Sequence, residues 1–399
     1  MSESAPCTRA VRAGIESDTQ HGAVVPPLHL SSNYSFEGLG GKRAYDYSRS
    51  GNPTRDLLGN ALAELEQGAG AVVTSSGMSA VALALELVPA GSKILAAHDC
   101  YGGTYRLFAA VLARWGLDYV PVHLSDLAAV RRCLADQPAR IVWVETPTNP
   151  LLGIADIAAL AEVAHAAGAL LVVDNTFASP RLQRPLVLGA DVVVHSTTKY
   201  INGHSDVVGG AVIAREAAVF EQLKWWANCN GLTGAPFDSY LTLRGLRTLS
   251  VRLRQHQENA ERIASRLDGH PAVRKVYYPG LASHAGHALA SRQQQGFGAM
   301  LSFELDGEVE QIAAFVDGLR YFSLAESLGG VESLIAHPAT MTHSSMAAEA
   351  RRTAGIADSL LRLSVGIEDG DDLLRDLDAA LLRAAVSADN DKSKRRVLA

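Results

Sequence analysis

A single lysine, Lys199, follows a short apolar stretch in the middle of the chain. Residues 191–195 (Asp-Val-Val-Val-His) are β-branched and apolar enough to form a buried strand. The hydroxyls of Ser196 and Thr198 lie between that strand and the lysine, where they can hold a phosphate group. Burial disfavours an ammonium ion, so a lysine placed there presents the neutral amine that attacks an aldehyde. Taken alone, the stretch equally fits a polar turn, and the solvated lysine is the commoner case because most lysines lie at protein surfaces.

Three further strand ends carry residues with possible chemistry. Asp174 closes the apolar run 170–174, as a turn residue or as the partner of a buried cation. Gly77 and Met78 open a helix directly after a strand, where their N–H groups either bind an anion or are simply capped. Tyr101 lies on a glycine-rich loop and either stacks on a planar ligand or fills the core.

Two residues outside this group are candidates for holding a carboxylate. Asn149 lies in a proline-bounded loop after the strand 141–145 and offers a side-chain donor. Arg362 alternates with apolar residues in a predicted strand at 360–365. An arginine on a half-buried strand usually pairs with a carboxylate, which belongs either to the protein or to a ligand.

The elements that position these residues alternate between short apolar strands and amphipathic helices. Such alternation predicts an α/β fold with a wound, mostly parallel sheet whose ligands lie at the carboxyl ends of the strands. Seven strands are expected, at 71–74, 93–97, 119–122, 141–145, 170–174, 191–195 and 209–213. Helices are expected between them, near 78–88, 104–115, 127–134 and 157–166. No GxGxxG follows the first strand, so a dinucleotide site is not expected.

The two ends of the chain are organised differently. Residues 1–60 are loop-like until Asn52 and Pro53, which predict the start of a helix running to Gln67. Tyr47 and Arg49 precede this helix on an exposed segment, either as surface decoration or as a phosphate-binding arm that packs on another subunit. We expect an arm at 1–60, a cofactor domain at 61–250 and a smaller α/β domain at 251–399, with a long basic amphipathic run at 240–267 whose length suits a connector between domains.

Composition excludes several classes of protein. The chain has 399 residues, a net charge of −6 and an isoelectric point near 6.1, so it lacks the basic surface of a nucleic-acid or membrane-surface binder. No apolar run has transmembrane length, and the first residues do not resemble a signal peptide. Four scattered cysteines and the absence of ligand-pair spacing predict a cytoplasmic protein without a metal site.

Taken together, these residues match the requirements of one cofactor, pyridoxal 5′-phosphate (PLP). PLP requires an amine for its aldehyde, an acid for its pyridine nitrogen, an aromatic ring to stack on and donors for its phosphate. Lys199 supplies the amine, Asp174 the acid and Tyr101 the aromatic ring. Arg362 would bind the α-carboxylate of an amino acid substrate. The phosphate donors would be Gly77, Met78, Ser196 and Thr198.

The chain resembles the Cys/Met-metabolism family of PLP enzymes over nearly its full length. The resemblance rests on five stretches: residues 47–55 (Tyr-Ser-Arg-Ser-Gly-Asn-Pro-Thr-Arg), 76–79 (Ser-Gly-Met-Ser), 173–177 (Val-Asp-Asn-Thr-Phe), 196–206 around Lys199, and 360–366 (Leu-Leu-Arg-Leu-Ser-Val-Gly). It implies a fold-type-I transferase with a large cofactor domain, a small C-terminal domain and a homotetrameric assembly. In that assembly Tyr47 and Arg49 would bind the phosphate of the neighbouring subunit's cofactor.

The resemblance also implies a reaction, a γ-replacement in which L-cysteine displaces the acyloxy group of O-succinyl-L-homoserine to give L-cystathionine and succinate. Lys199 would be the base, and Tyr101 would stack on the ring and assist proton transfer. Ser327 and Asn149 would help Arg362 to hold the carboxylate, and Arg106 would meet the succinyl group. Glu326 stands where relatives that cleave at Cβ have tyrosine, so that activity is disfavoured.

Two alternatives remain open at this point. The first is γ-elimination of cystathionine to cysteine, 2-oxobutanoate and ammonia, which needs the same proton transfers at Cα and Cβ and is not separated from γ-replacement by Glu326. The second is a non-catalytic α/β scaffold that only binds an anion and in which Lys199 is a surface residue.

Overall fold

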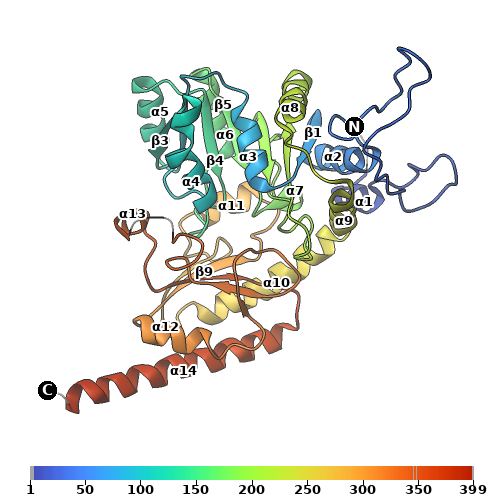
Figure 1. Cartoon of the computed structure of the whole chain (residues 1–399). Helices are drawn as coiled ribbons and strands as arrows, with labels where there is room; N and C mark the ends of the chain where they lie inside the picture. Colours follow the sequence, from blue (N-terminus) through green and yellow to red (C-terminus); the bar gives the residue numbers. More distant parts are fainter. Residues whose placement is uncertain (1–3, 345, 347, 398–399) are drawn as a thin grey trace. The chain divides into compact units, whose positions relative to one another are not determined.

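The computed structural model describes residues 4–344, 346 and 348–397, which form two compact units (Figure 1). The first unit comprises the chain up to Thr146 together with Ala155–Ser250. The second comprises Pro147–Ile154 and the chain from Val251 onward. The short segment Pro147–Ile154 therefore belongs to the second unit although it follows a strand of the first. The expected role of residues 1–60 as an arm on a neighbouring subunit stays a prediction.

The first unit contains a seven-stranded sheet in the order β1-β7-β6-β5-β4-β2-β3. Only β7 runs against its neighbours, so the other six strands point the same way. This confirms the predicted α/β fold and its mostly parallel sheet. The strands are β1 (Gly70–Thr74), β2 (Lys93–Ala97), β3 (Asp118–Val122), β4 (Ile141–Glu145), β5 (Leu170–Asp174), β6 (Val192–His195) and β7 (Gly210–Ala214).

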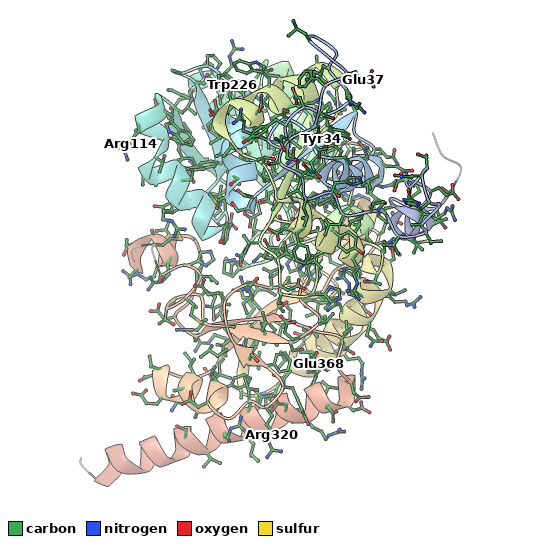
Figure 2. All side chains as sticks on the ribbon, turned by 45° about the vertical axis from the view of Figure 1, so that its right-hand side comes forward. Tyr34, Glu37, Arg114, Trp226, Arg320 and Glu368 are labelled. Carbon is green, nitrogen blue, oxygen red and sulfur yellow. The ribbon has the colours of Figure 1, made fainter. Side chains whose placement is uncertain are left out.

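Helices pack against this sheet and supply the core with apolar side chains. α2 and α8 lie on β1, α3 lies on β6 and β7, and α6 lies on β4 and β5. Trp143 and Val194 are among the fully buried residues of the sheet, and Trp226 of α8 packs at the edge of the same cluster (Figure 2). The helices of this unit are α1 (Pro6–Arg12), α2 (Pro53–Glu66), α3 (Gly77–Leu85), α4 (Gly102–Ala110), η1 (Leu112–Trp115), α5 (Leu127–Asp136), α6 (Ile157–Ala166), α7 (Ser179–Leu182), α8 (Ala217–Asn230) and α9 (Pro236–Leu246).

The second unit is built on a five-stranded sheet in the order β10-β11-β12-β9-β8. All neighbours are antiparallel except β10 and β11. Glu368, labelled in Figure 2, accepts hydrogen bonds from the backbone N–H (2.7 Å) and hydroxyl (2.9 Å) of Ser333, just before β11. The strands are β8 (Val273–Tyr277), β9 (Met300–Leu305), β10 (Ser323–Leu324), β11 (Leu334–Ala336) and β12 (Leu360–Ser364). The helices are α10 (Leu249–Leu267), which begins just before the boundary, α11 (His287–Gln293), α12 (Val309–Val316), α13 (Ala348–Thr353) and α14 (Gly370–Val397).

The predicted start of α2 is confirmed in atomic detail. Asn52 caps the helix, because its side-chain oxygen accepts the N–H groups of Thr54 (3.0 Å) and Arg55 (3.2 Å), and Pro53 fills the first helical position. The helix ends at Glu66, and Gln67 takes the left-handed conformation with φ of 61°.

Two stretches with a helical pattern are interrupted in the structure. The amphipathic run 240–267 contains the end of α9 and all of α10, separated at Arg247 and Thr248. Its basic amphipathic pattern continues across the break, so periodicity does not reveal it. The expected helix at 104–115 is likewise split into α4 and the 3₁₀ turn η1 at Val111. Among the described residues, none of the helices is both long and apolar enough to span a membrane.

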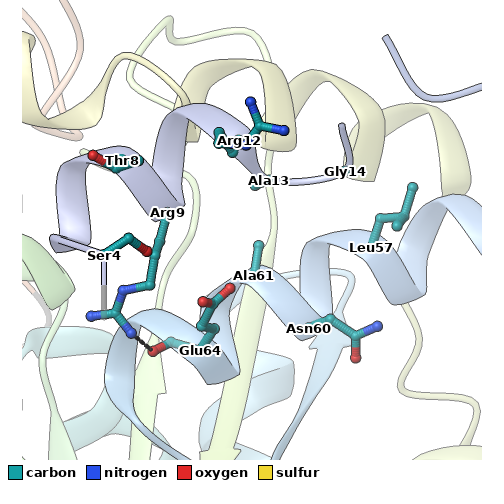
Figure 3. Close-up of a pocket in the computed structure, with 10 residues that line it drawn as sticks. All are labelled: Ser4, Thr8, Arg9, Arg12, Ala13, Gly14, Leu57, Asn60, Ala61 and Glu64. Carbon is teal, nitrogen blue, oxygen red and sulfur yellow. Dashed lines mark hydrogen bonds between the residues drawn. The ribbon is translucent and has the colours of Figure 1, made fainter. Parts of the chain in front are cut away.

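α1 lies against α2, and the two helices line an open cavity of about 270 Å³ (Figure 3). The guanidinium of Arg9 donates a hydrogen bond of 3.0 Å to the backbone carbonyl of Glu64, near the end of α2. This cationic contact at a helix C-terminus stabilises the carbonyls that lack intrahelical partners. None of the predicted site residues lines the cavity.

A buried polar network joins the last residue of α2 to the ends of β5 and β6. One oxygen of the Glu66 carboxylate accepts from Asn175 Nδ2 at 2.8 Å and lies 2.6 Å from Nε2 of His195. The side chains of Asn175 and Gln183 hydrogen-bond to each other at 3.0 Å. Glu66, His195 and Asn175 are fully buried, so each bond forms away from water, where an unmade bond is costly.

Glu66→Ala should therefore lower the free energy of unfolding by about 3 kcal/mol, since it leaves His195 and Asn175 buried without their acceptor. The matched control is Glu349→Ala, which removes an exposed carboxylate paired with Arg352 and should change stability little. Urea denaturation of both variants measures the difference. Equal unfolding midpoints for the two variants would contradict a stabilising role of the network.

Candidate active site

The predicted site residues of the first unit gather at one edge of the sheet. Because six strands point the same way, the segments that follow β1, β2, β4, β5 and β6 start from this edge. The amino end of the antiparallel β7 lies there too, since Gly210 pairs with Thr74. Residues distant in sequence therefore meet at this edge, as expected for a wound α/β sheet.

Gly77 and Ser196 lie in direct contact at the start of α3. A Cβ atom on Gly77 would come within 2.7 Å of the Ser196 Cβ, so only glycine fits beside this serine. The Ser76 side chain caps α3 by accepting from Ser79 N–H. In the described part of the chain, the N–H groups of Gly77 and Met78 donate to no other residue. The helix thus presents two backbone donors and its positive dipole end beside a hydroxyl.

The ring of Tyr101 and the sulfur of Met78 both lie close to Gly103. A Cβ on Gly103 would approach the Tyr101 ring to 2.5 Å and the Met78 sulfur to 3.1 Å. The backbone N–H of Tyr101 donates to the Glu145 carboxylate at the end of β4, at 2.7 Å. Tyr101 is 42% exposed, so of the two sequence interpretations the core-filling one does not hold.

Asp174 is a carboxylate held at the end of β5 with little solvent around it. Burial raises its pKa above the ordinary value, while the bond that one of its oxygens accepts from Thr176 N–H (3.0 Å) and the nearby His195 work in the opposite direction. The hydroxyl of Thr176 in turn accepts from Ser196 N–H at 2.9 Å. Thr176 therefore ties the loop after β5 to the loop after β6.

Lys199 is half-buried in the turn after β6, where its backbone N–H donates to Ser196 O at 3.3 Å. The Thr198 hydroxyl accepts from Gly209 N–H at 3.0 Å, which joins this turn to the start of β7. Lys199 is therefore part of an ordered turn and not a fully solvated surface lysine. The sheet edge brings together Gly77, Met78, Tyr101, Asp174, Ser196, Thr198 and Lys199.

The carboxylate candidates of the second unit form a separate cluster. Arg362 is only 2% exposed and donates from Nη1 to the Asn149 side-chain oxygen and from Nη2 to the Ser327 carbonyl, both at 2.9 Å. These two bonds fix the plane of a guanidinium that has five N–H donors. Ser327 has a positive φ of 80°, which turns its carbonyl toward the arginine. These hydrogen bonds join Arg362 to Asn149 and Ser327, the two residues that were predicted to act with it.

Four further predicted residues have no side-chain hydrogen bond to either cluster among the described residues. Arg49 donates from Nε to the Asn228 side chain of α8 at 3.1 Å, and its guanidinium carbon is 5.2 Å from the ring centroid of Tyr47. Arg106 and Glu326 are exposed, and no side-chain hydrogen bond or ion pair joins either to another residue of the described chain. Their roles stay predictions.

Several residues of the two clusters were missed from the sequence. Thr176 and Glu145 adjoin predicted site residues, and their position at strand ends was the available signal. His343 had no such signal. It is 1% exposed, with Nε2 3.1 Å from the Asn149 carbonyl, and burial followed by the charge of Arg362 lowers its pKa to about 4.

The family model described as Cys/Met metabolism PLP-dependent enzyme matches residues 7–382. The chain therefore belongs to this family of PLP-dependent enzymes, and its cofactor is PLP.

Individual relatives agree with this assignment. Cystathionine γ-synthase of Escherichia coli is 56% identical over 372 residues, which cover 93% of this chain and 96% of the relative. Cystathionine γ-lyase of Dictyostelium discoideum is 46% identical, with 94% and 97% covered. The crystal structure of cystathionine γ-synthase from Xanthomonas oryzae pv. oryzae in complex with cystathionine has a TM-score of 0.95 and 62% identity, and covers 97% of this chain and all of that chain (100%).

The residues at the sheet edge fit PLP. The N–H groups of Gly77 and Met78, which donate to no described residue, lie beside the Ser196 hydroxyl and suit a phosphate. A side chain at position 77 would collide with Ser196, so glycine is required at this position. A buried carboxylate with a raised pKa suits a protonated ring nitrogen, which would favour its charged form. The exposed ring of Tyr101 is available to stack on a flat ligand.

Gly77→Ala should weaken PLP binding by at least tenfold, because the new methyl group displaces Ser196 from the phosphate donors. The control is Gly231→Ala at the end of α8, where φ is 70° and nothing lies within 4 Å of a Cβ. That variant should lose stability through backbone strain and keep its PLP affinity. Absorbance titration of the apoprotein with PLP measures both, and unchanged affinity in Gly77→Ala would refute the phosphate assignment.

Stability should fall as the pH decreases from about 6.5 to 4. Burial lowers the pKa values of His256 and His343 to about 4, below the value of 6.5 in the unfolded chain. The unfolded state therefore binds more protons in this window, and stabilisation present above pH 6.5 is lost toward pH 4, up to about 3 kcal/mol for each histidine. Urea unfolding at several pH values measures this decline in the free energy of unfolding. The decline should be smaller in His256→Leu and should equal that of the parent in His21→Ala, which alters an exposed histidine. An undiminished decline in His256→Leu would contradict this explanation.

Proposed function

We propose that this chain is a cystathionine γ-synthase that replaces the succinyloxy group at Cγ of O-succinyl-L-homoserine with the sulfur of L-cysteine, giving L-cystathionine and succinate in the trans-sulfuration pathway. The observation that carries the proposal is a half-buried lysine in the turn after β6, at the same sheet edge as Asp174, in a chain 56% identical to a cystathionine γ-synthase over nearly all its length. The γ-lyase relative is ten percentage points less similar, at 46%, which favours replacement over elimination.

Each residue of the sheet edge has a role in this proposal. PLP, when bound, supplies an electron-withdrawing ring that stabilises negative charge at the substrate's Cα. Lys199 Nζ would remove the proton from Cα, deliver it to the cofactor and then remove a proton from Cβ, so that the Cγ–O bond breaks and the acyloxy group leaves as a carboxylate. The cysteine sulfur would then bond to Cγ as its thiol proton is lost, and protons would return to Cβ and Cα. Asp174 keeps the ring nitrogen protonated, and Tyr101 stacks on the ring and assists proton transfer.

The remaining residues bind and orient. The phosphate is held by the N–H groups of Gly77 and Met78 and by the hydroxyls of Ser196 and Thr198. Arg362 receives the substrate α-carboxylate, with Asn149 and Ser327 holding the guanidinium in place. Arg106 meets the succinyl carboxylate, and Glu326 occupies the position that differs in relatives that cleave at Cβ.

We also propose a homotetramer in which Tyr47 and Arg49 bind the phosphate of a neighbouring subunit's cofactor. The support is a row of exposed apolar side chains in the segment before α2, including Val24 (69%), Leu30 (65%) and Phe36 (49%). Such side chains are normally covered by protein. A cytoplasmic location is supported by four free cysteines, which suit a reducing compartment.

One set of assays tests the reaction. The parent enzyme should form cystathionine from O-succinyl-L-homoserine and cysteine, and should release little 2-oxobutanoate from cystathionine alone. Lys199→Ala should lose at least a thousandfold in kcat because it lacks the base. Lys275→Ala, which removes an exposed lysine, should keep the parental rate.

The outcomes separate the candidate functions. Release of 2-oxobutanoate from cystathionine without synthesis would support the γ-lyase alternative. Parental turnover in Lys199→Ala would refute the assignment of the base. The non-catalytic scaffold has lost its basis, because the family is one of enzymes.

A further inference from the structure

His343 is a buried histidine of the second unit with two defined hydrogen bonds. Its Nε2 lies 3.1 Å from the backbone carbonyl of Asn149, and its Nδ1 lies 2.9 Å from the hydroxyl of Thr342. A carbonyl oxygen only accepts, so Nε2 carries the ring hydrogen and Nδ1 accepts from the hydroxyl. The ring is thereby fixed in one tautomer and one orientation.

The bond from His343 reaches the residue that holds Arg362. The Asn149 side-chain oxygen accepts from Arg362 at 2.9 Å, and the next carbonyl, that of Pro150, accepts from the Ser302 hydroxyl at 2.7 Å. Two consecutive carbonyls are therefore held by side chains of the second unit. This fixes the backbone from which the Asn149 side chain extends, and hence the direction in which its oxygen faces the guanidinium.

The neutral ring is the form that suits this place. An imidazolium would add a second positive charge near Arg362, with Arg351 also close enough to act on it, and burial disfavours that charge further. The pKa of about 4 keeps the ring uncharged at neutral pH. His343 thus acts as a hydrogen-bond donor that does not compete with Arg362 for an anion.

We propose that His343 is a positioning residue for recognition of the substrate carboxylate, because it holds the Asn149 backbone and so aligns Asn149 with Arg362. This inference rests on the proposed assignment of Arg362 to the α-carboxylate. It adds a residue that touches neither substrate nor cofactor in the proposal. The effect is on substrate affinity and not on proton transfer at Lys199.

Kinetics of two substitutions test the inference. His343→Leu removes the donor and should raise KM for O-succinyl-L-homoserine roughly tenfold while kcat changes less than about threefold. His343→Gln keeps an Nε2 donor at a similar reach and should restore most of the affinity. An unchanged KM in His343→Leu, or a fall in kcat at constant KM, would overturn the proposal.

A matched variant separates positioning from loss of structure. His256 is also fully buried, has a similarly lowered pKa and hydrogen-bonds to a backbone carbonyl, that of Val365, at 2.6 Å. His256→Leu should lower the thermal midpoint about as much as His343→Leu and leave KM at the parental value. Equal rises of KM in both variants would show a structural effect only and would overturn the proposal.

Ligand binding gives a readout that does not depend on turnover. Calorimetric titration of the PLP-loaded enzyme with glycine should show about tenfold weaker binding in His343→Leu, whereas glycine methyl ester, which has no carboxylate, should bind both proteins alike. Equal weakening of both ligands, or of neither, would overturn the inference. Failure of the parent to make cystathionine, with the glycine difference intact, would refute the proposed reaction and leave the role of His343 standing.

Discussion

The candidate site of the first unit is arranged around a half-buried carboxylate, that of Asp174, at the end of β5. Burying a charged group is unfavourable unless donors or an opposite charge lie against it. Asp174 receives one backbone N–H from Thr176, and its pKa remains raised, so the site favours a ligand that brings a positive charge. The ring nitrogen of PLP, the cofactor of this family, is such a group.

Close backbone approach is the second constraint on this edge of the sheet. A Cβ on Gly210 would lie 2.2 Å from the Ser76 carbonyl, and one on Gly77 would overlap Ser196. The segments after β1 and β6 therefore meet at a separation that only glycine allows. This contact places the N-terminus of α3 beside the turn that carries Lys199. The two free N–H groups of α3 and the Lys199 turn are thus held at one sheet edge, although they lie more than a hundred residues apart.

How much the sequence predicts depends on whether a feature is local. β2, β4 and β5 match their predicted bounds, because short apolar runs bounded by turn residues leave few alternatives. The Asn52 cap is equally local. The break between α9 and α10 and the network around Glu66 were not predictable, since they arise from packing between distant segments. The same holds for His343, whose role depends on a carbonyl 194 residues earlier in the chain.

The loop after β4 contributes to both clusters, which explains its unusual composition. Glu145 holds the Tyr101 backbone in the first unit, and Asn149, four residues later, holds Arg362 in the second. Between them Thr146 accepts Ala155 N–H at 3.0 Å and Thr148 accepts Gly153 N–H at 2.9 Å, so the loop is bonded to the segment 153–155 that follows it. Within the second unit, the bonds to the carbonyls of Asn149 and Pro150 also hold this loop. The loop is therefore ordered by its own threonines and by side chains of the unit to which Asn149 belongs, which fixes the Asn149 side chain that contacts Arg362.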